Sequence, residues 1–456
     1  MRRARLALLF VCAAAASSAA ATPPRLSLGL AQAETMALER SPLIKAAGSD
    51  LASAQAEVEA GLSVLAPRVT LEGSYQYQTE VPKVSLAPGA APFQFGAHDN
   101  YSVGPALSYT LWDQGALLSA WRSQKALAGS REAQLELVRR QVLLLVRLDY
   151  FQVQLALERE RSLADSLRLA LVQYRDISQR FRAGAASRVD WLSAHEQVLE
   201  RSRDLRQAQA DAAAALRALF ALTGGGSGLD VSAPVDERIA DWESLGLSSA
   251  TASVGLEALE SVEQRLKIAA DSPLDEAYPQ LRVYEKQEEA QRLSARGAAA
   301  GRWPRLRLSF KSAYFYPDLP LLQGAWQNAA GLAASVPLFE WGLSRHEAQA
   351  QNRLADESAW RREQVLEELE RDWLAARDRY AALRYEERLD DESVQETAEI
   401  ARLRYASYRA GGSTILDVES ANLGAVEARV AAARRRTELL VQLATLASLS
   451  SQGGKP

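Results

Sequence analysis

The sequence predicts a mainly helical protein with a smaller, membrane-type β portion, built from two similar halves. Residues 116–183 and 343–410 contain no proline and together a single glycine, which favours very long helices. Four shorter segments alternate apolar and polar residues, as strands with two different faces do. The same motifs recur in the same order in both halves, which indicates an internal duplication.

The duplication is visible in four pairs of motifs. "SPLIKAA" at Ser41 resembles "YPQLRVY" at Tyr278, and "APRVTLEGSYQYQ" resembles "WPRLRLSFKSAYF" at the same offset. "LWDQG" matches "LFEWG", and "FRAGAASRVDWLSA" at Phe181 matches "YRAGGSTILDVESA" at Tyr408, both at a slightly shorter offset. Each half therefore has the order helix, two strands, long helix, turn and helix.

These motifs predict a division of the chain into five parts. A Gly-rich stretch, "TGGGSGLDVSAP", separates the halves and indicates a linker. We expect a signal peptide at 1–21, a first repeat at 22–222 with a β-hairpin at 67–112 and a turn at 183–189, a linker and equatorial segment at 223–277, a second repeat at 278–449 with a β-hairpin at 304–339 and a turn at 410–416, and a tail at 450–456.

The N-terminus and the overall charge narrow the class of protein. Three arginines precede the apolar run "LALLFVCAAAA", and small residues follow, as in a secretory signal peptide. The only cysteine, Cys12, lies in this segment; it could be lipidated, but Val11 is a poor residue before such a site. The net charge of −4 gives no basic excess for nucleic acid. His98, His195 and His346 are far apart in sequence, so we expect no metal site or other cofactor.

The alternating segments have the length and pattern of transmembrane strands. In residues 69–78, Val69, Leu71, Tyr75 and Tyr77 fall on one face and polar residues fall on the other. The partner strand at 101–111 and the second-half strands beginning at 306 and spanning 330–338 follow the same rule. Membrane strands span about 9–11 residues. A soluble hairpin with one wet face gives the same pattern, but four such strands in an exported chain favour the membrane.

A membrane sheet must close on itself, because backbone groups at an edge cannot stay unpaired in lipid. Small bacterial barrels need about eight strands. One chain offers four, so we expect several copies to share one barrel.

The long helices exceed what a compact globule needs. At 1.5 Å per residue, each stretch reaches roughly 100 Å. Apolar residues recur with coiled-coil spacing in the first stretch, at Leu144, Leu148, Phe151 and Leu155 and again at Leu163, Leu167, Ala170 and Tyr174. This periodicity fits both a channel wall and a plain antiparallel rod.

The motif that follows each long helical stretch predicts the end of that helix, a tight turn and the beginning of a second helix. Gly184 and Gly411 suit the left-handed position that ends a helix. Ser187 with Asp190, and Thr414 with Asp417, then form capping boxes that begin the next helix. Turn and capping chemistry does not require the neighbouring aromatic and basic residues, which are Phe181, Arg182, Tyr408 and Arg409. These residues therefore suggest a contact surface.

The paired "[FY]RAG…[ST]xxD" tips, the proline-led helix starts and the "LWDQG/LFEWG" strand exits resemble the TolC family of outer-membrane efflux proteins, over essentially the whole mature chain. This resemblance implies a homotrimer whose four strands per chain form one shared β-barrel in outer-membrane lipid. The duplicated helical hairpins would form a periplasmic α-barrel. Its partners would be a periplasmic adaptor protein and an inner-membrane transporter, with no nucleic acid.

The resemblance also assigns roles to residues at the tips. Asp417 would belong to a ring of carboxylates that narrows the periplasmic entrance, and Asp190 and Tyr408 would hold the tips shut. Where relatives carry a second acid, this chain has Ser420 with Glu419 beside it. The surface that meets the adaptor would comprise Phe181, Arg182, Gly184, Arg409, Gly411, Gly412 and Ser413, the last at a place where a basic residue is sometimes found.

Two other functional classes fit less of the sequence. A periplasmic coiled-coil adaptor explains the helices but not two strand pairs with aromatic faces. An enzyme requires a nucleophile with a base, a phosphate loop or a metal cluster, and the sequence shows none of these. The Gly-rich "TGGGSG" precedes no Lys-Ser/Thr pair and reads as a linker. The sequence leaves the transported substrate, the pump partner and the resting state open.

Overall fold

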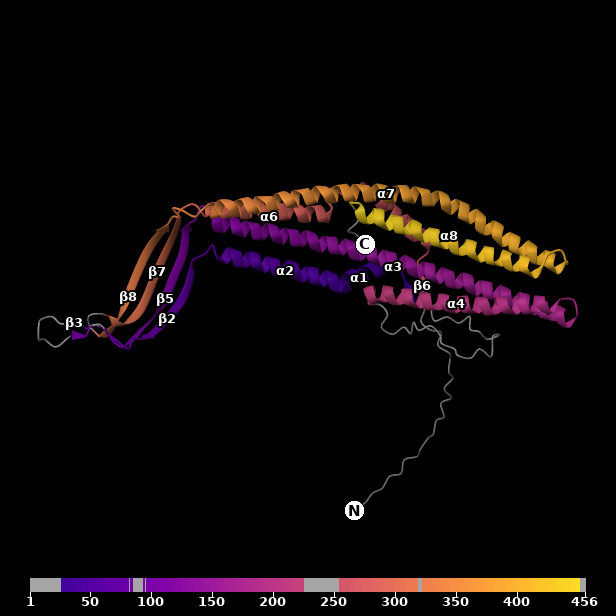
Figure 1. Cartoon of the computed structure of the whole chain (residues 1–456), viewed down its shortest axis with the longest axis horizontal. Helices are drawn as coiled ribbons and strands as arrows, with labels where there is room; N and C mark the ends of the chain where they lie inside the picture. Colours follow the sequence, from indigo (N-terminus) through magenta and orange to yellow (C-terminus); the bar gives the residue numbers. More distant parts are fainter. Residues whose placement is uncertain are drawn as a thin grey trace, which may run out of the picture.

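The computed structural model describes residues 26–81, 83–84, 93–94, 96–224, 254–318 and 322–451. The chain is elongated, with a curved sheet at one end and long helices that extend away from it (Figure 1). The predicted signal peptide, Cys12, linker residues 225–253 and tail residues 452–456 lie outside the described residues.

Each half contributes three helices of nearly matching length. The short helices have 22 residues each and begin with proline, which fits the first helical position because its missing N–H is not needed there. The long helices have 67 residues each, and the returning helices have 36 and 35. In chain order these helices are α2 (Pro42–Ser63), α3 (Ala116–Arg182), α4 (Arg188–Thr223), α6 (Pro279–Ala300), α7 (Leu343–Arg409) and α8 (Ile415–Leu449).

The four long strands form one antiparallel sheet in the order β2-β5-β7-β8, which confirms the predicted mainly helical fold with four strands. The strands are β2 (Arg68–Tyr77), β5 (Asp99–Trp112), β7 (Arg305–Asp318) and β8 (Gln323–Ser335), and the short pair β3 (Lys83–Val84) and β4 (Phe93–Gln94) extends the first hairpin. β8 begins seven residues before the predicted 330–338 and ends three residues before the predicted end, because Ser335 already pairs with Arg305, the first residue of β7.

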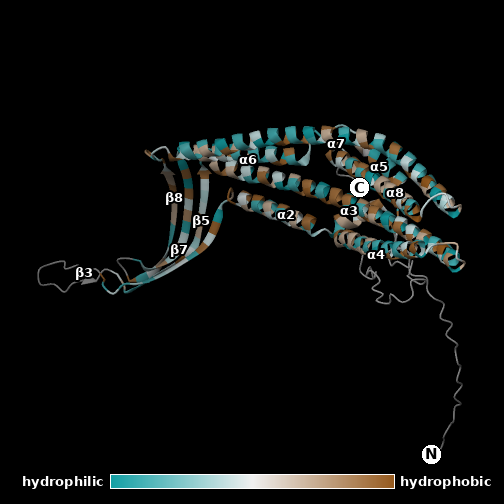
Figure 2. Cartoon of the chain, turned by 45° about the vertical axis from the view of Figure 1, so that its right-hand side comes forward, coloured by the Kyte–Doolittle hydropathy of each residue, from teal (hydrophilic) through white to brown (hydrophobic). Residues whose placement is uncertain are grey.

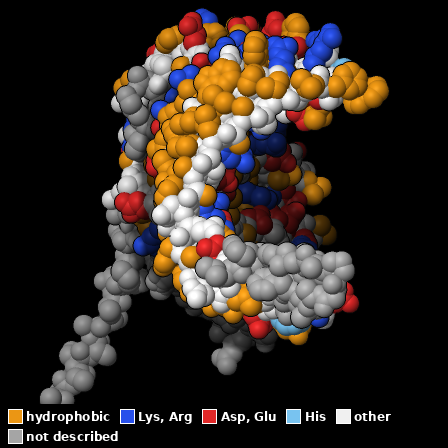
Figure 3. Space-filling model, turned by 90° about the vertical axis from the view of Figure 1, so that its left-hand side faces the viewer, with side chains coloured by type: hydrophobic (Ala, Val, Ile, Leu, Met, Phe, Trp, Pro, Cys, Tyr) orange, Lys and Arg blue, Asp and Glu red, His pale blue; other side chains and the backbone are white. Residues whose placement is uncertain are grey.

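The two faces of the sheet differ as the alternation predicts. Val69, Leu71 and Tyr75 are all more than 60% exposed in the single chain. On the other face, the hydroxyls of Ser74 and Ser102 lie 2.8 Å apart and Lys311 pairs with Glu72 at 3.4 Å. Seen from the sheet end, apolar side chains follow the arc of the molecule, while acidic and basic side chains line its hollow (Figure 3).

A belt of shorter elements covers the middle of the helices. It consists of β1 (Leu26–Leu28), α1 (Leu30–Arg40), β6 (Val254–Leu256) and α5 (Leu259–Ala270), and β1 and β6 pair in parallel. The Tyr150 hydroxyl of α3 donates to the Leu28 carbonyl at 2.8 Å and accepts from the Glu257 N–H at 2.9 Å. Tyr150 thus joins β1 and the residue that follows β6 to the long helix.

The helices bury their side chains unevenly. The largest core cluster includes Tyr150, Phe151, Leu216 and Leu440, where α3, α4, α8 and the belt meet. α7 is mainly hydrophilic along its length and buries few side chains in the single chain (Figure 2). Among the described residues, no helix combines the length and the apolar character needed to cross a membrane.

Candidate functional site at the helical tips

The two turns at the far end of the long helices each contain a glycine in the left-handed backbone conformation. Gly184 and Gly411 have φ of +73° and +81°, in the left-handed region that favours glycine. The N–H of Gly184 donates to the Phe181 carbonyl and that of Gly411 to the Tyr408 carbonyl, both at 3.0 Å. These bonds satisfy carbonyls that the helix ends would otherwise leave unpaired.

Both predicted capping boxes are present. Ser187 Oγ accepts from the Asp190 N–H at 3.0 Å, and Asp190 Oδ2 accepts from the Ser187 N–H at 3.1 Å. In the second turn the corresponding distances between Thr414 and Asp417 are 3.3 and 2.8 Å. The Asp417 side chain is fully exposed, and its pKa is lowered first by the backbone hydrogen bond from Thr414 and then by the threonine hydroxyl.

The two tips pack against each other through a small apolar cluster. Ile177 of α3, Ala194 of α4 and Ile415 and Val418 of α8 are buried in it. Trp191, Tyr405 and Tyr408 pack around this cluster and are partly buried. The far ends of both hairpins therefore form one unit within a single chain.

A polar group beside this cluster joins α3 to α7. The Tyr405 hydroxyl donates to Asp176 Oδ2 at 2.8 Å, and the Arg180 Nε lies 3.4 Å from the same oxygen. Burial, followed by the hydrogen bond to Asp176, raises the pKa of Tyr405 to about 12, so the phenol remains a donor at neutral pH. Sequence reasoning missed this pair, although Tyr405 and Tyr408 lie one turn apart and therefore share a helix face.

The structure also brings Asp190 and Tyr408 together from opposite hairpins. Tyr408 is half-buried, and its pKa is raised first by burial and then by the negative charge of Asp190. Asp190 thus contacts its own cap residue and faces the second hairpin. The hydrogen bonds that the Asp417 carboxylate accepts from described residues both come from Thr414 of its own turn.

The remaining predicted gate residues lie further along α8. Glu419 is partly buried, and its pKa is raised first by burial and then by the nearby charge of Glu200. Ser420 is exposed one residue later. Among the described residues, the charged neighbours of Glu419 are Glu200 and Arg201, whereas those of Tyr408 are Asp190, Arg180 and Asp176. The predicted gate residues therefore fall into separate groups within one chain.

The predicted contact residues around the turns are mostly exposed. Phe181 is 38% exposed and stacks on Trp191 of the same hairpin, with ring centroids 5.8 Å apart. Arg182 is exposed, whereas the Arg409 Nε lies 3.9 Å from Asp176. Gly412 donates its N–H to the Ser407 carbonyl at 2.9 Å, and Ser413 Oγ donates to the Arg404 carbonyl at 3.1 Å.

Within the described part of the chain, no group of three or more His, Cys, Asp and Glu residues could hold a metal ion.

The fold and its tips define a class of protein: a channel subunit with a short sheet for the membrane and long helical hairpins beyond it. The family model for outer membrane efflux proteins matches residues 35–225 and 274–452, nearly the whole of both halves. The chain therefore belongs to this family and is an outer-membrane efflux protein.

Solved structures show the same fold. A membrane protein from Pseudomonas aeruginosa matches with a TM-score of 0.73 at 18% identity, over 93% of this chain and 93% of that chain. The CmeC outer membrane channel of Campylobacter jejuni matches with a TM-score of 0.72 at 19% identity, over 93% and 86%. VceC, an outer membrane protein of Vibrio cholerae, matches with a TM-score of 0.72 at 16% identity, over 92% and 96%. A search of curated protein sequences finds no match.

Proposed function

We propose that three copies of this chain form a passive exit duct that carries substrates from a periplasmic adaptor and an inner-membrane transporter to the outside. The strands would close into one barrel in the outer membrane, and the helical hairpins would form a tunnel in the periplasm. The duct would have no catalytic role.

The observation that supports this proposal is the open sheet. β2 and β8 are its two edges, and each pairs with a neighbour on one side only. The unpaired backbone groups of such an edge cannot remain in lipid. Pairing β8 of one copy with β2 of the next would satisfy them and would place the exposed apolar face, including Leu71, toward lipid.

The tips would act as the gate of this duct. Tyr405 of the second hairpin bonds to Asp176 of the first, and Tyr408 of the second hairpin faces Asp190 of the first. These two pairs would favour the closed arrangement of the tips. Three copies would place three exposed Asp417 carboxylates around the entrance, where they would attract cations and repel anions. Contacts with the adaptor that fit only the splayed tips would shift the population toward the open state.

The turns themselves would provide the surface for the adaptor. Phe181, Arg182, Gly411 and Gly412 are exposed at the end of the molecule that lies furthest from the sheet (Figure 1). An exposed aromatic ring and an arginine are residue types enriched in protein interfaces. This surface is therefore suited to a partner that approaches along the long axis.

The proposal is tested by placing a charge on one face of β2 and then on the other. Leu71→Lys introduces a charge on the face proposed to meet lipid, which costs about 2–4 kcal/mol near the bilayer midplane. The matched variant Gln76→Lys places the same charge on the polar face of the same strand. We expect Leu71→Lys to reduce strongly the amount of trimer extracted from outer membranes, and Gln76→Lys to leave it near the wild-type level.

Two results would contradict the proposal. One is equal membrane yield for both lysine variants. The other is a wild-type protein that fractionates as a soluble monomer, as an adaptor or other periplasmic coiled-coil protein would. Native mass spectrometry of the detergent extract gives the number of copies directly.

A further inference from the structure

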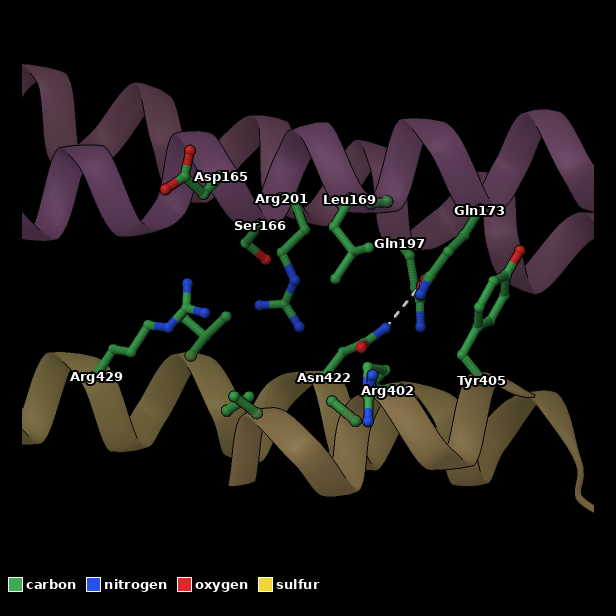
Figure 4. Close-up of a pocket in the computed structure, with 15 residues that line it drawn as sticks. Asp165, Ser166, Leu169, Gln173, Gln197, Arg201, Arg402, Tyr405, Asn422 and Arg429 are labelled. Carbon is green, nitrogen blue, oxygen red and sulfur yellow. Dashed lines mark hydrogen bonds between the residues drawn. The ribbon is translucent and has the colours of Figure 1, made fainter. Parts of the chain in front are cut away.

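A pocket lies between the two hairpins, where all four of their helices contribute to its lining (Figure 4). It encloses about 250 Å³. Of its lining residues, the gate proposed above uses Tyr405 alone, through the hydrogen bond to Asp176. Its lining nevertheless combines charge and hydrogen-bonding groups in a way that selects one class of ligand.

Positive charge dominates the lining. Arg201, Arg402 and Arg429 line the pocket, and Asp165 is the single acidic residue that does so. Asp165 is paired with Arg168 at 2.6 Å, and Arg402 is paired with Glu399 at 2.6 Å. Arg201 is also paired, with Asp204, but it is the one buried arginine of the lining, and Arg429 has no ion-pair partner among the described residues.

These two arginines come from opposite hairpins. Arg201 of α4 is 8% exposed, and its ion-pair partner, Asp204, lies 3.3 Å away with a side chain that is 42% exposed. Arg429 of α8 forms no ion pair with any residue in the described ranges. Both side chains extend into the gap in Figure 4. Glu419 borders the site near Arg201 without lining it.

The pocket also contains a hydrogen-bond acceptor that needs a donor. The Asn422 Nδ2 donates to the Gln173 Oε1 at 3.0 Å, and this pair bridges α8 and α3. The Asn422 Oδ1 is buried and has no hydrogen-bond partner among the described residues. A buried acceptor without a partner costs about 1–3 kcal/mol. A ligand that suits this pocket therefore carries negative charge and at least one N–H or O–H group.

We propose that this pocket binds a small oxyanion that carries a hydroxyl group, with Arg201 and Arg429 holding its charged oxygens and Asn422 Oδ1 accepting from its hydroxyl. Hydrogen phosphate, phosphate monoesters whose alcohol part bears a hydroxyl, and hydroxycarboxylates share this chemistry. Guanidinium groups suit such anions because their N–H groups form a planar fork. Since the two arginines belong to different hairpins, the bound anion joins the hairpins above the tips.

The test compares two anions of similar size. Inorganic phosphate carries a hydroxyl at pH 7, and sulfate does not. Calorimetric titration of the detergent-solubilised full protein should show one saturable phosphate site per chain and sulfate binding at least about tenfold weaker, since about 1.4 kcal/mol corresponds to a factor of ten. Glycerol phosphate and malate, titrated in the same way, distinguish a phosphate ligand from a hydroxycarboxylate.

Three variants assign the binding to the named residues. Arg429→Gln should weaken the binding of both phosphate and sulfate about tenfold or more, because it removes a charge-assisted hydrogen bond. Asn422→Leu should weaken phosphate to the level of sulfate and leave sulfate unchanged. Arg434→Gln is the matched control, since Arg434 lies on the same helix, is exposed and pairs with Glu438 at 3.2 Å instead; it should bind as the wild type does.

The inference is wrong if phosphate does not bind, if phosphate and sulfate bind equally, or if Arg429→Gln and Arg434→Gln behave alike. Arg429 is exposed, so its replacement is not expected to unfold the protein, and circular dichroism of each variant checks this. The binding measurement does not require conduction, so its outcome is independent of whether the duct proposal holds.

Discussion

The turn after α3 and the turn after α7 share their backbone geometry and their caps, yet their aromatic residues contact different elements. In the first turn, Phe181 stacks on Trp191 of its own hairpin. In the second, Tyr408 packs in the apolar cluster shared by both hairpins, close to Asp190. The duplication thus preserved the turn and changed the partner. Phe181 stacks within its own hairpin, whereas Tyr408 contributes to the contact between the two hairpins.

Removing the bonds between the hairpins gives the largest expected effect. A hydrogen bond from a phenol to a carboxylate contributes about 1.5–3 kcal/mol. Tyr405→Phe removes the bond to Asp176, so the ratio of closed to open tips should fall about tenfold or more. Single-channel recordings in planar bilayers should then show larger or more frequent openings.

The control for this prediction comes from the first tip. Phe181→Leu disturbs only stacking within one hairpin, so its conductance should stay close to that of the wild type. If Tyr405→Phe and Phe181→Leu give the same conductance, the difference between the tips has no bearing on gating.

The turn glycines test where the two tips are the same. A Cβ at Gly184 or Gly411 meets no atom within 4 Å, so Gly→Ala acts only through the left-handed backbone. Each substitution should destabilise its hairpin by about 1–2 kcal/mol. Thermal unfolding followed by circular dichroism should give similar losses for the two variants. A loss confined to one of them would show that the turns are not equivalent.

Features that depend on a few neighbouring residues could be predicted from the sequence. The glycine turns and both capping boxes follow from the backbone chemistry of residues that adjoin one another, and the alternation of β2 follows from its own side chains. The bond between Tyr405 and Asp176 depends on the relative rotation of two helices, which no local pattern encodes.

The coiled-coil seam shows the same limit within one helix. Near the tip, the predicted Leu163 and Leu167 are buried, as a two-helix seam requires. Near the belt, Leu144 and Leu148 are only partly buried, and Val146 and Tyr150 are buried instead. The belt covers α3 on a further side there, so the buried face widens and shifts. The apolar periodicity of one helix cannot predict which of its faces an element from elsewhere in the chain will cover.

Asp417 and Asp190 separate the capping role from a role at the entrance. Asp417→Ala should lower the stability of the protein slightly through the lost capping box and should weaken block or selective conduction of cations in planar bilayers. Asp190→Ala loses an equivalent cap but should change opening rather than ion selectivity, because Asp190 faces Tyr408. Unchanged ion dependence in Asp417→Ala would remove this residue from the gate.

The smallest effects concern pH, and here Asp417 and Glu419 have opposite signs. The pKa of Asp417 is lowered in the folded protein by the Thr414 N–H, so its charged form stabilises the fold above an ordinary carboxyl pKa of about 3.9 and this contribution is lost as pH falls through the folded value. The pKa of Glu419 is raised by burial and by Glu200, so its charged form destabilises the fold. That penalty is relieved as pH falls through the raised pKa toward about 4.3.

Melting temperatures of the wild type and of Glu419→Gln and Asp417→Asn, measured from pH 7 to pH 3, separate these two contributions. Between pH 7 and about pH 4.5, Glu419→Gln should gain less stability on acidification than the wild type does, because the amide has no charge to lose. Below about pH 4, Asp417→Asn should lose less than the wild type. Since Asp417 is fully exposed and Glu419 only partly buried, both differences should be small. A wild-type pH profile that neither substitution changes would show that the two carboxyl groups have the same protonation behaviour in the folded and unfolded chain.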